Sequence, residues 1–258
     1  MRYFLRLSYN GESFHGWQSQ PNAMGVQQKI EEALSVVTRL PVSIVGAGRT
    51  DAGVHAREMF AHFDLPKPVD DKRRLIISLN RLVGRNIAID DLIEVAEDAH
   101  ARFDAVERTY KYFVTFKKSA FLYPYAWYSP SRLDIDMMNE AASELLQTED
   151  FTSFAKLHSD AKTNICDVRH AKWDVADNDI SNGFSGLFVD GIVFTISADR
   201  FLRNMVRAVV GTLVEVGRKK ISVQDFKDII LRRDRCSAGI SMPAEALFLW
   251  SVKYPYII

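Results

Sequence analysis

The sequence predicts an α+β protein made of two similar halves, in which mainly antiparallel strands form a sheet with helices on one face. Two observations lead to this prediction. Short runs of alternating apolar residues, typical of half-buried strands, are separated by stretches in which apolar residues recur at helical spacing. The element order β-α-β-β-α-β of the first half also begins again near residues 100–107, so we assign the halves to residues 1–104 and 105–258.

The first half contains four expected strands and two expected helices. Alternation of apolar and polar residues indicates the strands, and apolar residues three or four positions apart indicate the helices. The strands are residues 2–9, 42–45, 59–63 and 87–96, and the helices are residues 26–40 and the stretch around Leu75, Leu79 and Leu82. Glycines and prolines punctuate the loop between the first strand and the first helix.

The second half repeats this order around a polar, irregular piece at about residues 155–186. The expected strands are residues 108–116, 186–197 (one long strand or a pair) and 246–254, with a basic strand-like segment at residues 166–173. The expected helices are residues 136–147, 201–217 and 223–233. The halves share element order without visible sequence identity.

The composition is that of a soluble globular protein, with 47% hydrophobic and 26% charged residues. Because 33 basic residues balance 33 acidic ones, a nucleic-acid ligand would require basic side chains gathered on particular faces. Cys166 and Cys236 have neither metal-binding spacing nor a disulfide framework, which favours a reducing compartment, by default the cytoplasm. No signal peptide, membrane span or cofactor motif is apparent, so we expect a protein without metal or cofactor.

The stretch GAGRTDAGVHA, residues 46–56, is the most unusual feature of the chain. It lacks the ending of a phosphate-binding P-loop, and Asp51 stands where a dinucleotide fingerprint needs its third glycine. A tight turn, in which glycine supplies a positive φ and Asp51 bonds its own backbone, is the simplest alternative. Three glycines and two interleaved alanines exceed what such a turn requires, and they would allow another molecule to approach the backbone closely.

Arg49 and Asp51 are two residues apart in this stretch. In an extended segment such residues point to the same side, so we expect the guanidinium beside the carboxylate. A neighbouring guanidinium favours the ionised carboxylate and orients its oxygens. An ionised carboxylate free of competing bonds can act as a covalent nucleophile, which is our hypothesis for Asp51.

A second basic cluster lies in DRFLRNMVRAVVG. If this segment is helical throughout, Arg200, Arg203 and Arg207 lie along one stripe, with Gly211 one turn farther along. The alternative is the solvated face of an amphipathic helix. Such a face normally interleaves acidic residues, and none occurs between Arg200 and Val214.

The segment RTYKY is the third candidate. In a strand, Tyr110 and Tyr112 share a face and Lys111 points to the other. A tyrosine flanked by Arg108 and Lys111 could stack on a base and hold its phosphate. The alternative is a pair of core tyrosines that use their hydroxyls at the edge of the sheet.

The loop GRTDAGVHA resembles the catalytic loop of the tRNA pseudouridine synthase A family. Further segments resemble the family in the same order, from about residue 9 to 254, and they are YNGESFHGWQSQ, GVQQKIEEAL, SLNRLV, ARFDAVERTYKY, EDFTSF, FLRNMVRAVVG and MPAEALFLWSVKY. The resemblance implies an extended sheet with a central cleft between the halves, a homodimer, and no cofactor. It also implies isomerisation of uridine to pseudouridine in the anticodon stem-loop of tRNA, at positions 38 to 40.

Carried over position by position, the resemblance implies roles for individual residues. Asp51 corresponds to the nucleophile, Tyr110 to the tyrosine that stacks on the target base, and Arg207 to the arginine that pairs with the catalytic carboxylate. Leu247 matches an apolar residue of the base pocket, while Arg49 and Gln18 match motif residues near the site. The residues that we expect to bind RNA by charge are Arg108, Lys111, Arg200, Arg203, Lys72, Arg73 and Arg74.

The chain departs from the family pattern at a few positions. LNRLVGRN replaces the usual LNxxLPxD, which leaves the turn at Val83 and Gly84 open. Ala246 replaces a glycine before Leu247 and would narrow the pocket by one methyl group, and Arg203 stands where a histidine is common.

The resemblance leaves three chemical routes open, namely attack of the carboxylate at C1′ of the ribose, attack at C6 of the base, or passage through a glycal. Two other classes of function compete with it. One is an RNA-binding module without catalysis, which would leave the Asp51 loop unexplained. The other is a hydrolase or glycosidase, for which no second carboxylate appears in any candidate motif. The modified uridines and the dimer surface are not evident from the sequence.

Overall fold

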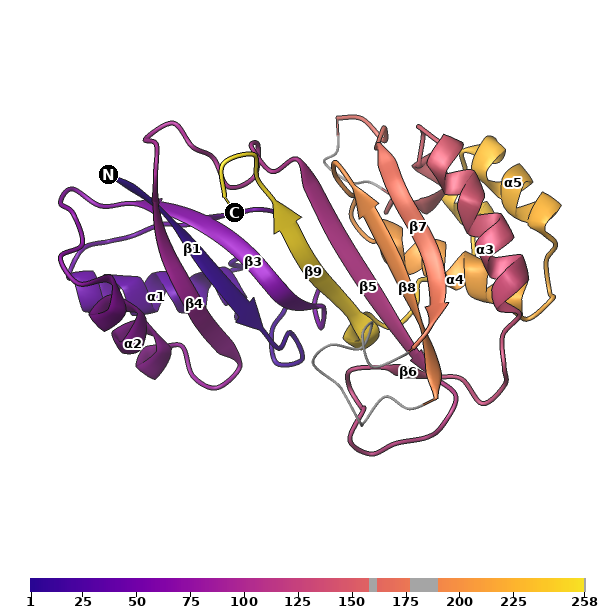
Figure 1. Cartoon of the computed structure of the whole chain (residues 1–258), viewed down its shortest axis with the longest axis horizontal. Coiled ribbons are helices and arrows are strands. Elements are labelled where there is room, and N and C mark those ends of the chain that lie inside the picture. The colour runs from indigo at the N-terminus through magenta and orange to yellow at the C-terminus, as the bar shows by residue number, and fades with distance from the viewer. Residues whose placement is uncertain (158–161, 177–189, 258) are drawn as a thin grey trace. The chain divides into compact units, whose positions relative to one another are not determined.

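A computed structural model of the chain describes residues 1–157, 162–176 and 190–257 (Figure 1). The chain forms two compact units, of which unit 1 contains Met1–Glu107 and Leu249–Ile258, and unit 2 contains Arg108–Phe248. The sequence predicts a boundary between residues 104 and 105, with the whole C-terminus in the second half. The structure instead groups Leu249–Ile258 with unit 1, because the last strand runs beside a strand of that unit.

Unit 1 has the predicted order of strands and helices. Its strands are β1 (Arg2–Tyr9), β2 (Val45–Gly46), β3 (His55–Asp64) and β4 (Ile87–Val95), and most of β9 (Leu247–Lys253) also belongs to it. They are arranged in the order β4-β1-β3-β9, with β2 on β3, and the pairs β1–β3, β1–β4 and β2–β3 are antiparallel. The predicted mainly antiparallel α+β fold is confirmed here.

The two helices of unit 1 are α1 (Val26–Thr38) and α2 (Lys72–Leu82), and they pack against each other. Asp71 caps α2, because its carboxylate accepts a hydrogen bond from the backbone N–H of Arg74. Alternate residues of β1 face opposite sides of the sheet. On one side Phe4 packs edge-on against Tyr254 of the C-terminal segment, and on the other the hydroxyl of Tyr3 accepts a hydrogen bond from Val69, just before α2.

In the described part of unit 2 the strands are β5 (Glu107–Thr115), β6 (Trp127–Tyr128), β7 (Val168–Val175) and β8 (Gly191–Ala198). β8 lies between β5 and β7 and pairs antiparallel with both, and the short β6 pairs parallel with β5. The predicted strand over residues 186–197 therefore corresponds to β8, although residues 186–189 lie outside the described residues. The basic strand-like segment at residues 166–173 corresponds to β7.

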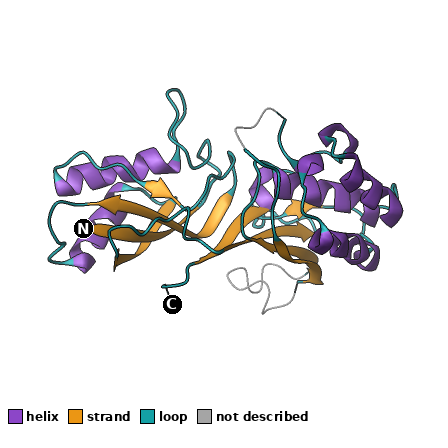
Figure 2. Cartoon of the chain, turned by 90° about the horizontal axis from the view of Figure 1, so that it is seen from above, coloured by secondary structure: helices purple, strands orange, loops and turns teal. Residues whose placement is uncertain are grey.

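The helices of unit 2 are α3 (Ile135–Ser143), α4 (Met205–Gly217) and α5 (Val223–Arg232). Figure 2 shows them gathered on one side of the strands of this unit. Short 3₁₀ turns extend the connections at Glu144–Gln147, Thr152–Phe154, Arg235–Ser237 and Ala244–Ala246. α4 is the central helix, since nearly all of its residues are buried, whereas α5 is amphipathic and begins with a capping box formed by Ser222 and Asp225.

One expected feature of α4 is wrong. The prediction placed Arg200, Arg203 and Arg207 on a single helical stripe, but the helix begins only at Met205. Its N-cap, Asn204, has a left-handed backbone with φ 67°, so the helix does not extend backward through the two preceding arginines. Gly211 does not leave a bare face either, because a Cβ there would lie 1.8 Å from the carbonyl oxygen of Ile240.

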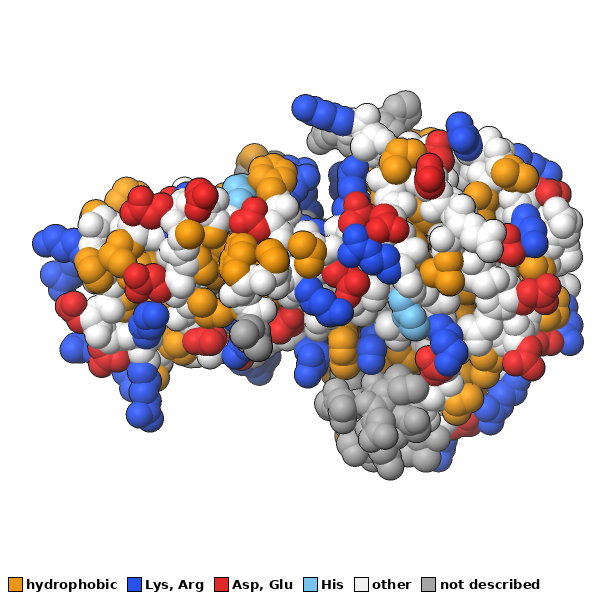
Figure 3. Space-filling view, turned by 45° about the horizontal axis from the view of Figure 1, so that its top comes forward, with side chains coloured by type: hydrophobic (Ala, Val, Ile, Leu, Met, Phe, Trp, Pro, Cys, Tyr) orange, Lys and Arg blue, Asp and Glu red, His pale blue; other side chains and the backbone are white. Residues whose placement is uncertain are grey.

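Charged side chains of both signs are interspersed over the face drawn in Figure 3, in line with the zero net charge. Within the described part of the chain, no helix is both long enough and apolar enough to cross a membrane. The same residues contain no cluster of three or more His, Cys, Asp or Glu side chains placed to hold a metal ion.

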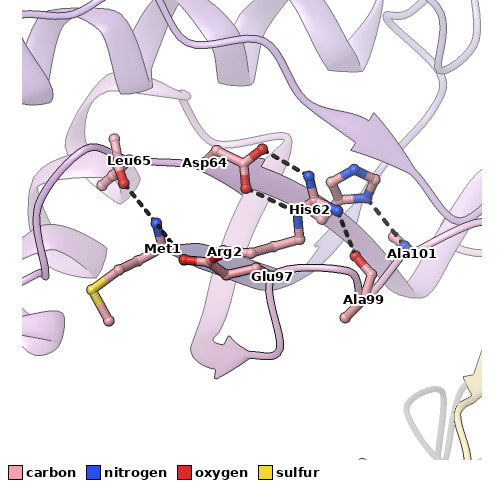
Figure 4. A network of polar contacts seen from close by, with 8 residues as sticks. All are labelled: Met1, Arg2, His62, Asp64, Leu65, Glu97, Ala99 and Ala101. Carbon is pink, nitrogen blue, oxygen red and sulfur yellow. Dashed lines mark hydrogen bonds and ion pairs between the residues drawn. The ribbon is translucent and has the colours of Figure 1, made fainter.

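A polar network fastens the beginning of β1 to the end of β3 and to the loop after β4 (Figure 4). Arg2 donates two hydrogen bonds of 2.8 Å to the carboxylate of Asp64 and one of 3.0 Å to the carbonyl of Ala99. Beside it, Nδ1 of the buried His62 accepts a hydrogen bond of 3.1 Å from the backbone N–H of Ala101. The network therefore ties three segments of unit 1 that are distant in sequence.

This network predicts a pH-dependent stability. Burial, helped by the nearby His100 and Arg2, lowers the pKa of His62 to about 4. Between this value and the ordinary histidine pKa of about 6.5, the unfolded chain binds a proton that the native chain does not, so the free energy of unfolding falls as the pH falls. We expect a loss of about 3 kcal/mol across this range, measured by urea unfolding at a series of pH values.

The matched variants are His62→Asn and His170→Gln. Asparagine retains an acceptor for Ala101 but has no titrating ring, so the larger share of the pH dependence should disappear. His170 is exposed on β7, and its replacement should leave the dependence as it is. An unchanged slope in His62→Asn would contradict the assignment.

Candidate active site

The Asp51 loop, defined here as residues 46–56, connects β2 to β3 in unit 1. It closes on itself through a hydrogen bond of 3.2 Å from the N–H of Val54 to the carbonyl of Asp51, and Gly53 takes a left-handed conformation with φ 80°. This is the turn chemistry that the glycine pattern suggested. The side chain of Asp51 is only half-buried, so its carboxylate is not enclosed within the turn.

A second loop, residues 10–17 (the supporting loop), packs against the Asp51 loop. The N–H of Trp17 donates to the carbonyl of Thr50 at 3.2 Å, and the N–H of Gly53 donates to the carbonyl of Phe14 at 3.3 Å. The two backbones lie so close that a Cβ on Gly11 would be 2.0 Å from the carbonyl oxygen of Val54. Glycine is therefore required in the supporting loop where its backbone meets the Asp51 loop.

Gly16 is the position at which this requirement is sharpest, and it gives a prediction. Its φ is +90°, and a Cβ there would lie 2.5 Å from the carbonyl oxygen of Thr50. We expect Gly16→Ala to lower the free energy of unfolding by about 2 kcal/mol or more, and the melting temperature by about 5 °C. Gly48→Ala is the matched control, because a Cβ at Gly48 meets nothing within 4 Å. The melting temperatures of the two variants are measured by differential scanning fluorimetry. Equal values would contradict the proposal that the backbone at Gly16 supports the Asp51 loop.

Two side-chain contacts that sequence reasoning missed also hold the Asp51 loop. The hydroxyls of Tyr9 and the buried Thr50 are 2.9 Å apart and hydrogen-bonded. Nδ1 of the buried His55 accepts a hydrogen bond of 3.0 Å from the N–H of Gly11. Because each contact joins residues about 40 positions apart, no local pattern could have revealed it. Together they fix both ends of the segment that carries Asp51.

The expected pairing of Arg49 with Asp51 is not present. Among the described residues, the exposed side chain of Arg49 forms no hydrogen bond or ion pair. The exposed guanidinium of Arg49 therefore does not hold the carboxylate of Asp51. Gln18 is exposed directly after the supporting loop, and its carbonyl oxygen would lie 2.5 Å from a Cβ on Gly25.

Arg207 lies in the first turn of α4 in unit 2. Its Nε donates a hydrogen bond of 2.7 Å to the carbonyl of Met242, and the N–H of Met242 donates back to the carbonyl of Arg207 at 3.1 Å. This reciprocal pair of hydrogen bonds fixes the position of the Arg207 side chain at its Nε atom. The two terminal nitrogens are then the groups that can meet a carboxylate in a forked geometry.

The segment that receives Arg207, residues 239–242, is held along α4 by small residues and side-chain hydrogen bonds. The hydroxyl of Ser241 bonds to Asn204 at 2.6 Å and to Arg235 at 2.9 Å. The backbone of Gly239 lies against Thr212 and donates to its hydroxyl at 2.9 Å. These contacts explain why Gly211 cannot be larger, and they set the position of Met242 and hence of Arg207.

Tyr110, Arg108 and Arg200 come together around the end of β8. The ring of Tyr110, on β5, contacts the ring of Phe201 edge-on at 5.0 Å. Arg108 donates to the carbonyl of Asp199 at 2.6 Å, and the carboxylate of Asp199 accepts from the N–H of Arg200 at 2.7 Å. Phe201 was not among the candidates. Its contact supports the ring of Tyr110 from one side.

The other tyrosine of this strand fits the alternative interpretation. Tyr112 is fully buried, and its hydroxyl donates to the carbonyl of Pro243 at 3.1 Å. Burial raises its pKa well above the ordinary value. Tyr112 is therefore a core residue, and only Tyr110, which is partly exposed, remains as a stacking residue.

The remaining candidates are dispersed over unit 2 and unit 1. Leu247 is buried at the start of β9, directly after the buried Ala246. Arg203 is exposed before α4, and its carbonyl accepts from the N–H of Lys156 at 3.1 Å. Lys111 lies opposite Thr195 on the β5–β8 pair. Lys72, Arg73 and Arg74 form the exposed first turn of α2.

Comparison with known proteins identifies the family. A family model described as tRNA pseudouridine synthase matches residues 141–255. The tRNA pseudouridine synthase A of Parabacteroides distasonis is 54% identical over 254 residues, which cover 98% of this chain and 96% of that protein. The chain belongs to the tRNA pseudouridine synthase A family. The family is also represented by a protein of Porphyromonas gingivalis, 51% identical over 255 residues (98% and 97% covered), and one of Bacillus subtilis, 37% identical over 261 residues (98% and 99%).

The resemblance found in the sequence motifs is thus confirmed at the level of the family. The alignments to these tRNA pseudouridine synthases A extend over nearly the whole chain. Both units therefore belong to the family protein, including the Asp51 loop of unit 1 and the residues Tyr110 and Arg207 of unit 2.

Proposed function

We propose that this protein isomerises uridine to pseudouridine in the anticodon stem-loop of tRNA, with Asp51 as its nucleophile. The observation that carries the proposal is the half-buried carboxylate of Asp51 on a loop held by a second loop, Tyr9 and His55. A nucleophile must keep its position while its substrate approaches. The contacts that hold the backbone of the Asp51 loop provide this. The uridines at positions 38 to 40 are the proposed targets.

The proposed reaction is balanced within one nucleotide. The bond between N1 of uracil and C1′ of ribose breaks, and a bond between C5 and C1′ forms. C5 loses its hydrogen as a proton and N1 gains one, so the reaction needs no oxidant and no group donor. A carboxylate can assist by forming an ester at C1′ or by adding to C6, and the glycal route would instead need a base for the C2′ proton.

We assign the other roles as follows. Tyr110 stacks on the target base after it leaves the helical stack, and Phe201 supports its ring from the side. Arg207, whose Nε is held by the carbonyl of Met242, pairs with the Asp51 carboxylate through its terminal nitrogens. Leu247 lines the base pocket. Arg49 is reassigned from orienting Asp51 to contacting RNA, since its side chain is exposed, and the exposed Gln18 is assigned the same role.

Affinity for tRNA then comes from local basic faces, since the whole chain has no net charge. Around Asp199, Arg108 and Arg200 form such a group, and Arg203 and Lys111 extend it. In unit 1, Lys72, Arg73 and Arg74 stand at the N-terminus of α2, where the helix dipole disfavours positive charge. A phosphate ligand would offset this unfavourable placement.

Release of tritium from tRNA labelled at C5 of uracil tests the proposal. The wild-type protein should release tritium without releasing free uracil, and tRNA from cells lacking the protein should lack pseudouridine at the target positions. Binding of tRNA without release would support the module without catalysis. Release of free uracil would support a glycosidase.

We also propose that the protein is a homodimer and that it acts in the cytoplasm. The two cysteines, Cys166 and Cys236, are free thiols in the structure, which suits a reducing compartment. Light scattering should give twice the 29.4 kDa mass of the chain.

A further inference from the structure

The connection between β5 and β6, residues 116–126, exposes aromatic side chains that the fold does not use. In Figure 1 it leaves the lower end of β5 and returns to the short β6. Phe121 is 76% exposed and Tyr123 68% exposed, and Tyr128 of β6 is exposed at 42%. Single exposed apolar residues are ordinary, but several large aromatic side chains within eight residues mark a surface that meets something else.

These rings are presented by an anchored segment. Leu122 and Ala126 are buried, and the N–H of Ala126 donates to the carbonyl of Leu122 at 3.0 Å. At the start of the connection, the hydroxyl of Thr115 donates to the carbonyl of Lys117 at 2.9 Å and accepts from its N–H at 3.2 Å. Phe121 and Tyr123 are the sequence neighbours of the buried Leu122. Because the side chain of Leu122 is held inside the protein, those of its two neighbours are held at the surface.

The charge of the same segment is of one sign. From Phe116 to Leu133 the sequence contains no acidic residue, while it contains Lys117, Lys118 and Arg132. Both lysines are exposed, and neither forms an ion pair among the described residues. Arg132 lies over the ring of Phe116 at 4.8 Å and pairs with Asp190 at 2.9 Å.

Rings at which bases can stack, next to exposed ammonium groups that can hold phosphates, are the combination that recognises unpaired nucleotides. A protein partner fits less well, because exposed lysine is depleted at protein interfaces. We propose that the β5–β6 connection binds unpaired nucleotides of the tRNA substrate. Bases stack on Phe121 and Tyr123, and Lys117 and Lys118 contact the backbone phosphates. This inference rests on the proposed function and adds a substrate-binding surface to it.

Two double variants separate the stacking from the charge. We expect Phe121→Ala with Tyr123→Ala to raise the Kd for an unmodified, fluorescently labelled tRNA transcript at least about tenfold. KM for tritium release should rise in parallel while kcat stays within about twofold, because no reacting group is removed. Lys117→Ala with Lys118→Ala should lower the slope of log Kobs against log salt concentration by about 1.5, since each phosphate contact contributes roughly 0.7 to 0.9.

The controls address folding and non-specific effects. Phe121→Tyr with Tyr123→Phe keeps both rings and should keep the wild-type Kd. Leu231→Ala with Arg232→Ala removes an exposed apolar and an exposed basic residue from α5 and should change neither Kd nor the salt slope. Unchanged Kd and salt slope in both loop variants would overturn the proposal. So would a fall in the mass of the assembly with RNA binding unchanged, which would assign the surface to a second copy of the chain.

The wild-type measurement keeps this test separate from that of the proposed function. If wild-type protein fails to release tritium, the proposed function fails, whatever the loop variants do. If wild-type protein releases tritium and the loop variants bind tRNA as tightly as it does, only the β5–β6 surface fails.

Discussion

Asp51→Ala is expected to reduce tritium release from labelled tRNA by about four orders of magnitude or more, because loss of a nucleophile removes the reaction path itself. Binding of tRNA should persist, since the remaining contacts are made to phosphates and bases elsewhere. Asp51→Asn keeps the size of the side chain without its charge and should be equally inactive. Single-turnover release and the Kd are measured in parallel, so that chemistry and binding are separated.

Asp70→Ala is the matched control for this prediction. Asp70 is an exposed aspartate before α2, and among the described residues it forms no hydrogen bond or ion pair. Its replacement should leave both rate and affinity at wild-type values. Tritium release by Asp51→Ala at a rate comparable to the wild type would show that the nucleophile lies elsewhere.

Arg207→Ala is expected to lower kcat by about a hundred- to a thousandfold and to raise the Kd for tRNA by less than about threefold. The guanidinium is proposed to hold the reacting carboxylate, so its loss should act mainly on the rate. Arg207→Lys retains the charge but offers no Nε donor for Met242 and no fork for a carboxylate, so it should recover only part of the lost rate.

Circular dichroism and the melting temperature accompany these two variants, because Arg207 also anchors the segment around Met242. A rise in Kd that matches the loss in kcat/KM, with kcat unchanged, would assign Arg207 to RNA binding and contradict the pairing role.

Much of the fold follows from local sequence. The period-two runs in β1 and β5 and the helical spacing in α1 and α5 give the right elements in the right order. The start of α4 is the exception. FLRN has apolar and basic residues at helical spacing, yet Asn204 adopts a left-handed conformation and bonds to Ser241, 37 residues away. A tertiary contact overrides the local preference there.

In the candidate site, too, some features follow from local sequence and others depend on tertiary contacts. The motif around Asp51 could be recognised because its residues are contiguous. The roles of Gly11 and Gly16 could not, because the backbone that they accommodate belongs to Val54 and Thr50. Likewise, the position of Arg207 depends on Met242, and the support of Tyr110 depends on Phe201. The pairing of Arg49 with Asp51 was mispredicted, because their spacing in the sequence does not determine whether the Arg49 side chain turns to the carboxylate or to solvent.

The sequence by itself determined the family, the order of strands and helices, and the loop that carries the proposed nucleophile. These are properties of short segments, in which composition, spacing and backbone preference act over a few residues. Only the tertiary structure decided which residues hold that loop, where α4 begins, that Leu249–Ile258 joins unit 1, and that Phe121 and Tyr123 are exposed. The reason is that burial and close backbone contact arise between segments distant in sequence, and a single chain read in order does not specify which segments meet.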